Sequence, residues 1–138
     1  MTFEGERVRR WEGEMKKKNV SSELSIKFAL RIIKLYKYLC DEKHEYDMSK
    51  QLYRSGTSIG ANIAESNNAQ SKADYVNKLS IALKEADETE YWLTLLFLSE
   101  IISEAEHKSI QGDLDIIIGT LVNIIKKVKE QWKSFYWL

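Results

Sequence analysis

The sequence predicts an all-α protein, an antiparallel up-down-up-down bundle of four helices. Its 138 residues include no proline and only 6 glycines, which favours long uninterrupted helices over a chain rich in turns. Apolar residues also recur at helical spacings of three and four through four segments separated by short polar stretches. Short connections place consecutive helices antiparallel, and a chain of this length can bury the core of one domain.

Residues 1–20 are expected to form a charged, loosely held N-terminal arm, and residues 21–138 to form the bundle. The arm lacks the apolar core of a secretory signal peptide. The longest strongly apolar stretch, Tyr91–Leu98, is far shorter than the ~18 residues that span a membrane. The single cysteine, Cys40, cannot form an internal disulfide, which fits a reducing compartment. We therefore expect a cytoplasmic protein that makes no membrane contact.

The first helix, from about Ser22 to Cys40, carries more apolar surface than one core requires. A helix at the surface of a bundle needs an apolar stripe a little over ~100° wide, and here the apolar positions cover more than half of the circumference. One stripe suits the core and contains Leu24, Phe28, Ile32, Leu35 and Leu39. A second side contains Ile26, Leu30 and Ile33, and we expect another subunit to cover it.

The polar part of the same helix is a basic ridge. It consists of Lys27, Arg31 and Lys34, with Lys37 to one side, and Glu23 is the only acid on the helix. Such a ridge can contact the phosphates of a nucleic acid or remain a solvated face. Both interpretations stay open at this point.

The second helix is predicted for residues 51–68, QLYRSGTSIGANIAESNN, and contains two glycines. Each glycine inside a helix costs about 1 kcal/mol relative to alanine, so Gly56 and Gly60 require a compensating close approach of a neighbouring helix. Another face carries a polar stripe of Arg54, Ser58, Asn62 and Glu65. This stripe is interpreted as the satisfied polar edge of a packing helix, and a ligand site is the alternative.

Capping boxes mark where the third and fourth helices begin. The first box is Ser71-Lys-Ala-Asp74, and its helix is expected to continue to about Ile102. The second box is Ser103-Glu-Ala-Glu106. Asn67 is expected to end the second helix in left-handed geometry, as is Asn68. The fourth helix has a heptad seam of Ile110, Leu114, Ile117, Leu121, Ile124, Val128 and Phe135.

An antiparallel turn near residue 68 also predicts which residues of the second and third helices lie level. Arg54 falls beside residues 83–86, which predicts an ion pair with Glu85. Glu65 falls beside Lys72. We expect these pairs to be largely buried, where ion pairs specify register more than they stabilise.

No motif in the sequence indicates catalysis. The sequence has no glycine-rich phosphate loop, no CxxC and no HExxH. Glu104-Ala-Glu-His107 has the Glu-x-x-His spacing of di-iron bundles, but it is a single copy at a helix start, whereas such sites need two copies at mid-helix. Asp41-Glu-Lys-His44 lies in a connection. We therefore expect no enzyme activity, no metal and no cofactor.

Three segments carry a resemblance to a known family. They are LSIKFALRIIKLYKYL, QLYRSGTSIGANIAES and KADYVNKLSIALKEADETEYWLTLL. These segments resemble the four helix bundle protein family, also called the 23S rRNA intervening-sequence protein family, over about residues 22–130. The Arg54, Ser58, Asn62 and Glu65 pattern is the most specific part of the likeness.

The resemblance implies a ring-like homo-oligomer, a homopentamer, built from four-helix protomers. It also implies a relationship to the accessory variability proteins of diversity-generating retroelements, which bind nucleic acid and a reverse transcriptase. Two functions follow as expectations: a non-enzymatic scaffold that binds RNA or DNA through repeated basic ridges, or a protein–protein adaptor that binds no nucleic acid. The formal net charge of zero does not favour a strongly basic nucleic-acid binder.

Overall fold

The computed structural model describes residues 3–15 and 19–136, and every element within these ranges is an α-helix. The helices are α1 (Phe3–Met15), α2 (Val20–Asp41), α3 (Asp47–Ser66), α4 (Lys72–Leu98) and α5 (Glu104–Tyr136). The prediction of an all-α fold is confirmed. The described residues form five helices, one more than the four predicted for the bundle, because the charged arm also contains a helix, α1. No helix in the described ranges is both long and apolar enough to cross a membrane.

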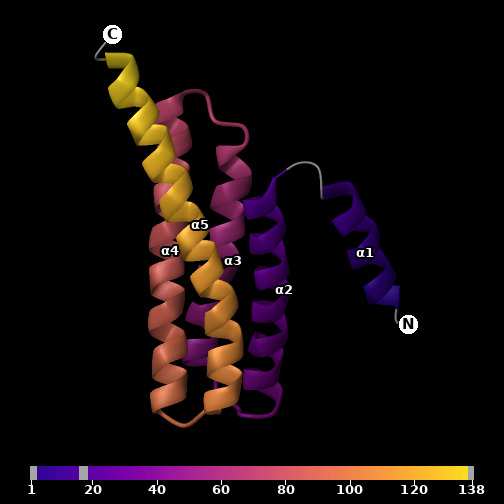
Figure 1. The fold of residues 1–138 in the computed structure, drawn as a ribbon. Helices are drawn as coiled ribbons and strands as arrows, with labels where there is room; N and C mark the ends of the chain where they lie inside the picture. The colour runs from indigo at the N-terminus through magenta and orange to yellow at the C-terminus, as the bar shows by residue number, and fades with distance from the viewer. Residues whose placement is uncertain (1–2, 16–18, 137–138) are drawn as a thin grey trace.

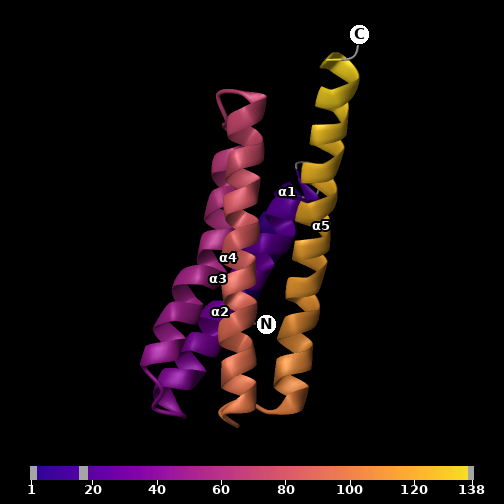
Figure 2. The same cartoon turned by 90° about the vertical axis from the view of Figure 1, so that its left-hand side faces the viewer.

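Helices α2 to α5 alternate in direction and lie side by side in one bundle (Figure 1). α3 packs against α2 and α4, and α5 packs against α4 and α2, so that the packing closes around a common core. α1 stands beside α2, on the side away from α4 (Figure 1). Figure 2 shows that α5 extends past the other helices at its C-terminal end.

The core consists of aliphatic side chains that all four bundle helices contribute. Its fully buried members include Phe28 and Ile32 of α2, Ile59 of α3 and Leu93 of α4. The heptad seam of α5 faces this core, as predicted, with Leu114 and its seam neighbours buried. The seam residues Ile110, Ile117 and Leu121 are buried, Ile124 and Val128 are half-buried, and the side chain of Phe135 lies outside the described residues.

The close approach that the glycines of α3 require is present. A Cβ atom on Gly56 would lie 2.8 Å from Cγ1 of Ile32 on α2. A Cβ atom on Gly60 would lie 3.2 Å from Oγ of Ser25, also on α2. The sequence prediction is therefore confirmed, and the helix that approaches these glycines is α2 of the same protomer.

The two predicted capping boxes form to different extents. In the second box, Glu106 N–H donates to Oγ of Ser103 at 3.1 Å, and Ser103 N–H donates to the carboxylate of Glu106 at 2.8 Å. Hydrogen bonding of the Glu106 carboxylate by the backbone and then the side chain of Ser103 lowers the pKa of Glu106, because it favours the charged form. In the first box, Ser71 accepts from Asp74 N–H at 3.1 Å, but the carboxylate of Asp74 accepts from Gln70 N–H instead of Ser71 N–H.

The predicted left-handed end of α3 is wrong. Asn67 is right-handed, with φ −66°, because its side chain is held by residues before and at the start of α2. Its Nδ2 donates to Oγ of Ser22 at 3.1 Å, and its Oδ1 accepts from Asn19 at 3.1 Å. Left-handed residues lie instead in the connection after α2, where His44 has φ 53°, and after α4, which ends at Leu98, short of the expected Ile102. There Glu100 has φ 62°.

Candidate interaction surfaces

The outer face of α2 consists of Ile26, Leu30 and Ile33. Ile26 and Leu30 are each 36% exposed, and Ile33 is half-buried. On the opposite side of the same helix, Phe28 and Ile32 are almost completely buried in the core. The helix therefore has two apolar sides, and the protomer covers only one of them fully. This is the arrangement that its sequence predicted.

The predicted basic ridge is partly neutralised within the chain. Nζ of Lys27 lies 3.3 Å from the carboxylate of Glu23. Arg31 reaches α5, where it lies 2.6 Å from the carboxylate of Asp113. The same guanidinium donates to the hydroxyl and the carbonyl of Ser109, at 2.8 and 3.2 Å. These contacts use the charge of Arg31 to join two helices that are distant in sequence.

Lys34 and Lys37 complete the ridge, and both are exposed. Lys34 also lines a hollow of about 580 Å³ between α2 and the start of α5. The hollow is walled mainly by apolar groups, with two cations and one carboxylate among its residues. Its lining is Arg31, Lys34, Leu35, Tyr38, Ile102, Ala105, Glu106, Ser109 and Ile110. The basic ridge is thus best preserved at the C-terminal half of α2.

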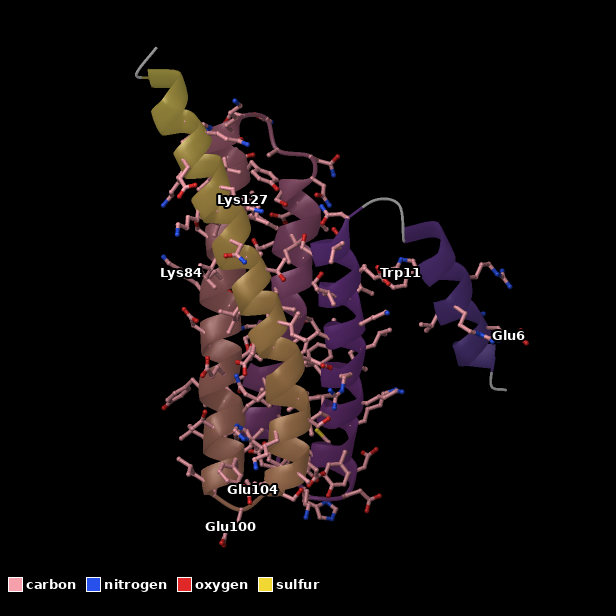
Figure 3. All side chains as sticks on the ribbon, viewed as in Figure 1. Glu6, Trp11, Lys84, Glu100, Glu104 and Lys127 are labelled. Carbon is pink, nitrogen blue, oxygen red and sulfur yellow. The ribbon has the colours of Figure 1, made fainter. Side chains whose placement is uncertain are left out.

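A second basic area, which the sequence analysis did not single out, lies on α4 and α5. Figure 3 places Lys127 toward the end of the bundle where α5 terminates and Lys84 nearer mid-height, whereas Glu100 and Glu104 lie at the opposite end. The area includes Lys84, Lys126, Lys127 and Lys129, all exposed. Lys126 and Lys129 line a hollow of about 390 Å³ whose apolar part is Leu83, Val122 and Ile125. The run of lysines near the end of α5 was the available signal.

The predicted ion pair between α3 and α4 is present. Nη1 of Arg54 lies 3.2 Å from the carboxylate of Glu85, and the guanidinium also binds Glu88, which sequence reasoning missed. The carboxylate of Glu88 also accepts a hydrogen bond from the indole N–H of Trp92 at 3.3 Å. Hydrogen bonds from Arg54 lower the pKa of Glu88. The expected burial is wrong, since the Arg54 side chain is 50% exposed.

The other members of the polar stripe serve their own helix or a different partner. Ser58 donates to the carbonyl of Arg54 at 2.6 Å, and Asn62 donates to the carbonyl of Ser58 at 2.8 Å. Glu65 lies 2.9 Å from Nζ of Lys78, so the expected neighbour Lys72 is wrong. The stripe is a satisfied polar edge and does not converge on a single point.

The register error has a visible cause. Thr89 of α4 lies opposite Ser55 of α3, with 3.0 Å between their buried hydroxyl oxygens. A symmetric turn near residue 68 would place Ser55 level with about residue 82, so this contact shifts α4 along α3 by about seven residues, or two helical turns. The long side chain of Arg54 reaches both Glu85 and Glu88, so the predicted pair with Glu85 forms despite the shift. The shorter Glu65 contacts Lys78 instead of Lys72.

Comparison with known proteins identifies the family. The family model described as 23S rRNA-intervening sequence protein matches residues 17–123, which is more than half of the chain. The chain belongs to this family. It is also similar to a solved protein of unknown function from the S23 ribosomal protein family of Bacteroides thetaiotaomicron, at 55% sequence identity and a TM-score of 0.77. The likeness covers 78% of this chain and 99% of that chain. No curated protein matches the chain.

The titratable groups considered for chemistry in this member of the family each contact a different neighbour. His107 stacks on Phe97 with ring centroids 4.7 Å apart. His44 is exposed, and its Nδ1 lies 3.2 Å from the hydroxyl of Tyr46. Cys40 is half-buried, with Sγ 3.7 Å from Oγ of Ser49. Within residues 3–15 and 19–136, no group of three or more His, Cys, Asp or Glu side chains could hold a metal ion.

Proposed function

We propose that this member of the 23S rRNA-intervening sequence protein family is a non-enzymatic, ring-forming homo-oligomeric scaffold that binds RNA or DNA. The observation that carries the proposal is the outer face of α2, because its apolar side chains remain exposed on a helix already anchored in the core by its other side. Burying exposed apolar surface contributes roughly 25 cal/mol per Å², so such a face favours association. The homopentamer implied by the family resemblance is the assembly we expect.

Light scattering at high protein concentration tests the scaffold part of the proposal. The wild-type chain is expected to have a mass several times that of the protomer. Leu30→Glu places a charge in the outer face of α2, where Lys34 four residues on can pair with it and support the helix, and should reduce the mass to that of one protomer. Lys50→Glu on α3 is an exposed control and should leave the mass unchanged. A monomeric wild-type chain would overturn the proposal.

Nucleic-acid binding is supported by the exposed lysines on two surfaces and by the repetition that a ring provides. Weak contacts gain strength when several copies are presented together, because later contacts form at high effective concentration. The first test is retention of single-stranded DNA or RNA as a function of salt, since phosphate contacts weaken with ionic strength. Lys34→Gln with Lys37→Gln and, separately, Lys126→Gln with Lys129→Gln should identify the surface. Lys50→Gln is the matched control.

The alternative is a protein–protein adaptor that binds no nucleic acid. The engagement of Arg31 by Asp113 and Ser109 favours it, because that cation is used inside the chain. A polypeptide partner such as a reverse transcriptase would then bind the ring. Absence of nucleic-acid retention even at low salt, in a chain that still assembles, would favour this alternative over the first function.

A further inference from the structure

We propose that the outer face of α2 is covered by a particular surface of a second copy, namely the outer face of α5, defined by Gly112, Ile116 and Gly119. This inference rests on the proposed scaffold function and deepens it, since it names the two surfaces that meet. The two faces belong to different helices of the protomer. The contact is therefore heterologous, with each copy offering α2 to one neighbour and α5 to the other.

The outer face of α5 is shaped to receive side chains. Ile116 is 56% exposed at mid-helix. Gly112 and Gly119, one turn to either side, are open: a Cβ atom built on either would meet no heavy atom within 4 Å. The outer face of α5 is thus one apolar side chain between two positions without side chains. Projecting residues such as those on the outer face of α2 can lie in these two positions.

The two faces also lie at the same height in the bundle. Arg31 on α2 binds Asp113 on α5, and the two helices run in opposite directions (Figure 1). Both helices rise ~1.5 Å per residue, so three residues forward along α5 correspond to three residues back along α2. Ile116 is therefore level with Phe28, between Ile26 and Leu30. A copy rotated about an axis parallel to the bundle can place one face on the other without a vertical shift.

Charge distinguishes this contact from a symmetric one between two α2 helices. Lys34 and Lys37, both exposed, lie beside the outer face of α2. Two such faces brought together would juxtapose like charges, which is unfavourable. The α5 segment from Gly112 to Gly119 reads GDLDIIIG and has no basic residue; Asp113 already binds Arg31 of its own protomer, and Asp115 is the acid exposed beside the outer face of α5. An α2 face against an α5 face pairs apolar centres and brings opposite charges close.

Closure follows from these two features. A heterologous contact forms either a ring or an open filament, depending on whether the rotation between copies closes without a rise along the axis. Equal height of the two faces removes the need for a rise. The proposed contact therefore predicts a finite ring with no unpaired outer face of α2 or of α5.

A mixing experiment with light scattering tests the proposal on the full chain. Leu30→Glu disables one face and Ile116→Glu disables the other, and each variant alone should have the mass of one protomer. Each variant retains the face that the other lacks. An equimolar mixture should therefore form a pair with twice the protomer mass and grow no further, because both remaining faces are disabled.

A second variant keeps the test valid if a glutamate disturbs folding. Gly119→Gln adds a side chain where the protomer has open space and replaces a poor helix former, so the protomer should fold at least as well. In the proposed contact this side chain obstructs the neighbour, and the assembled fraction should fall at concentrations where the wild type is assembled. Leu98→Glu, on an exposed apolar residue of α4, is the matched control and should assemble normally.

The outcomes separate this inference from the function on which it rests. A monomeric wild-type chain would contradict both the proposed contact and the scaffold function. If the wild type assembles while Ile116→Glu and Gly119→Gln assemble equally well, the scaffold function stands and the α5 contact is wrong. A mixture that stays at protomer mass also contradicts the contact. Loss of assembly in Trp11→Glu but not in Ile116→Glu would assign the coverage to α1 and overturn the inference.

Discussion

The glycines of α3 and the glycines of α5 have opposite surroundings. A Cβ atom on Gly56 would lie 2.8 Å from the side chain of Ile32, whereas a Cβ atom on Gly119 would meet nothing within 4 Å. Each glycine costs its helix about 1 kcal/mol relative to alanine. In α3 the close approach of α2 offsets that cost inside the protomer. In α5 the protomer offers no such compensation, so any compensation must come from outside it.

Gly56→Ala is expected to have the largest effect on the stability of the protomer. The new methyl group would clash with branched atoms of Ile32, which is buried and has little room to move. Overpacking of this kind typically costs 1–3 kcal/mol, and about 2 kcal/mol is expected here after the gain in helix propensity. Urea denaturation monitored by circular dichroism measures it. Unchanged stability would show that the α2–α3 seam has space that the structure does not reveal.

Gly119→Ala should change stability in the opposite direction. With no neighbour to displace, alanine should stabilise α5 by about 1 kcal/mol. The measurement is best made in the Leu30→Glu background, where assembly does not contribute to the melting temperature. A destabilised protein would mean that the space around Gly119 is occupied within the protomer, and the contrast between the two glycine pairs would be lost.

Thr89→Val tests the small buried groups that accompany the glycines in the interior. Valine keeps the shape of threonine but removes the hydroxyl that lies 3.0 Å from Oγ of Ser55. Ser55 then keeps only a weak bond to the Leu52 carbonyl at 3.4 Å. A loss of about 1 kcal/mol is expected in chemical denaturation. Thr94→Val, on the outer part of α4, is the matched control and should change stability much less.

Acid should weaken the start of α5 by a smaller amount. The pKa of Glu106 is lowered in the folded state by hydrogen bonds from Ser103, so its contribution is complete above the unfolded value of about 4.3 and disappears as pH falls through the folded value. The melting temperature of the wild type should therefore fall more steeply below about pH 5 than that of Glu106→Gln. Glu104→Gln removes a neighbouring charge without removing the cap and serves as control. Parallel curves for wild type and Glu106→Gln would contradict the prediction.

Local features of this fold could be predicted from sequence because they depend on residues near one another. The capping boxes at Ser71 and Ser103 predict where two helices begin, and the glycines of α3 predict the close approach of another helix. The Arg54–Glu85 pair also follows, since α3 and α4 are joined by a short turn and long side chains tolerate a shifted register. Such predictions use only the period of the helix and the direction reversal at a connection.

Features that join distant segments could not be predicted in the same way. Arg31 binds Asp113 because α2 and α5 are neighbours in the closed bundle, and no turn connects them. Asn67 stays right-handed because residues around the start of α2 hold its side chain. Glu65 meets Lys78 because α4 is shifted along α3. In each case a tertiary contact decided the outcome against a local preference.

The corner between α4 and α5 determines which side of the last helix faces outward. Glu100 adopts a left-handed backbone there, and its N–H donates to the carbonyl of Phe97 at 3.0 Å while Ile101 N–H donates to that of Leu96 at 3.0 Å. These bonds fix the corner's length. One inserted residue would turn α5 by about 100° around its own axis. The rotation would carry Leu114 away from the core. The length of the corner therefore determines which residues of α5 face the other helices.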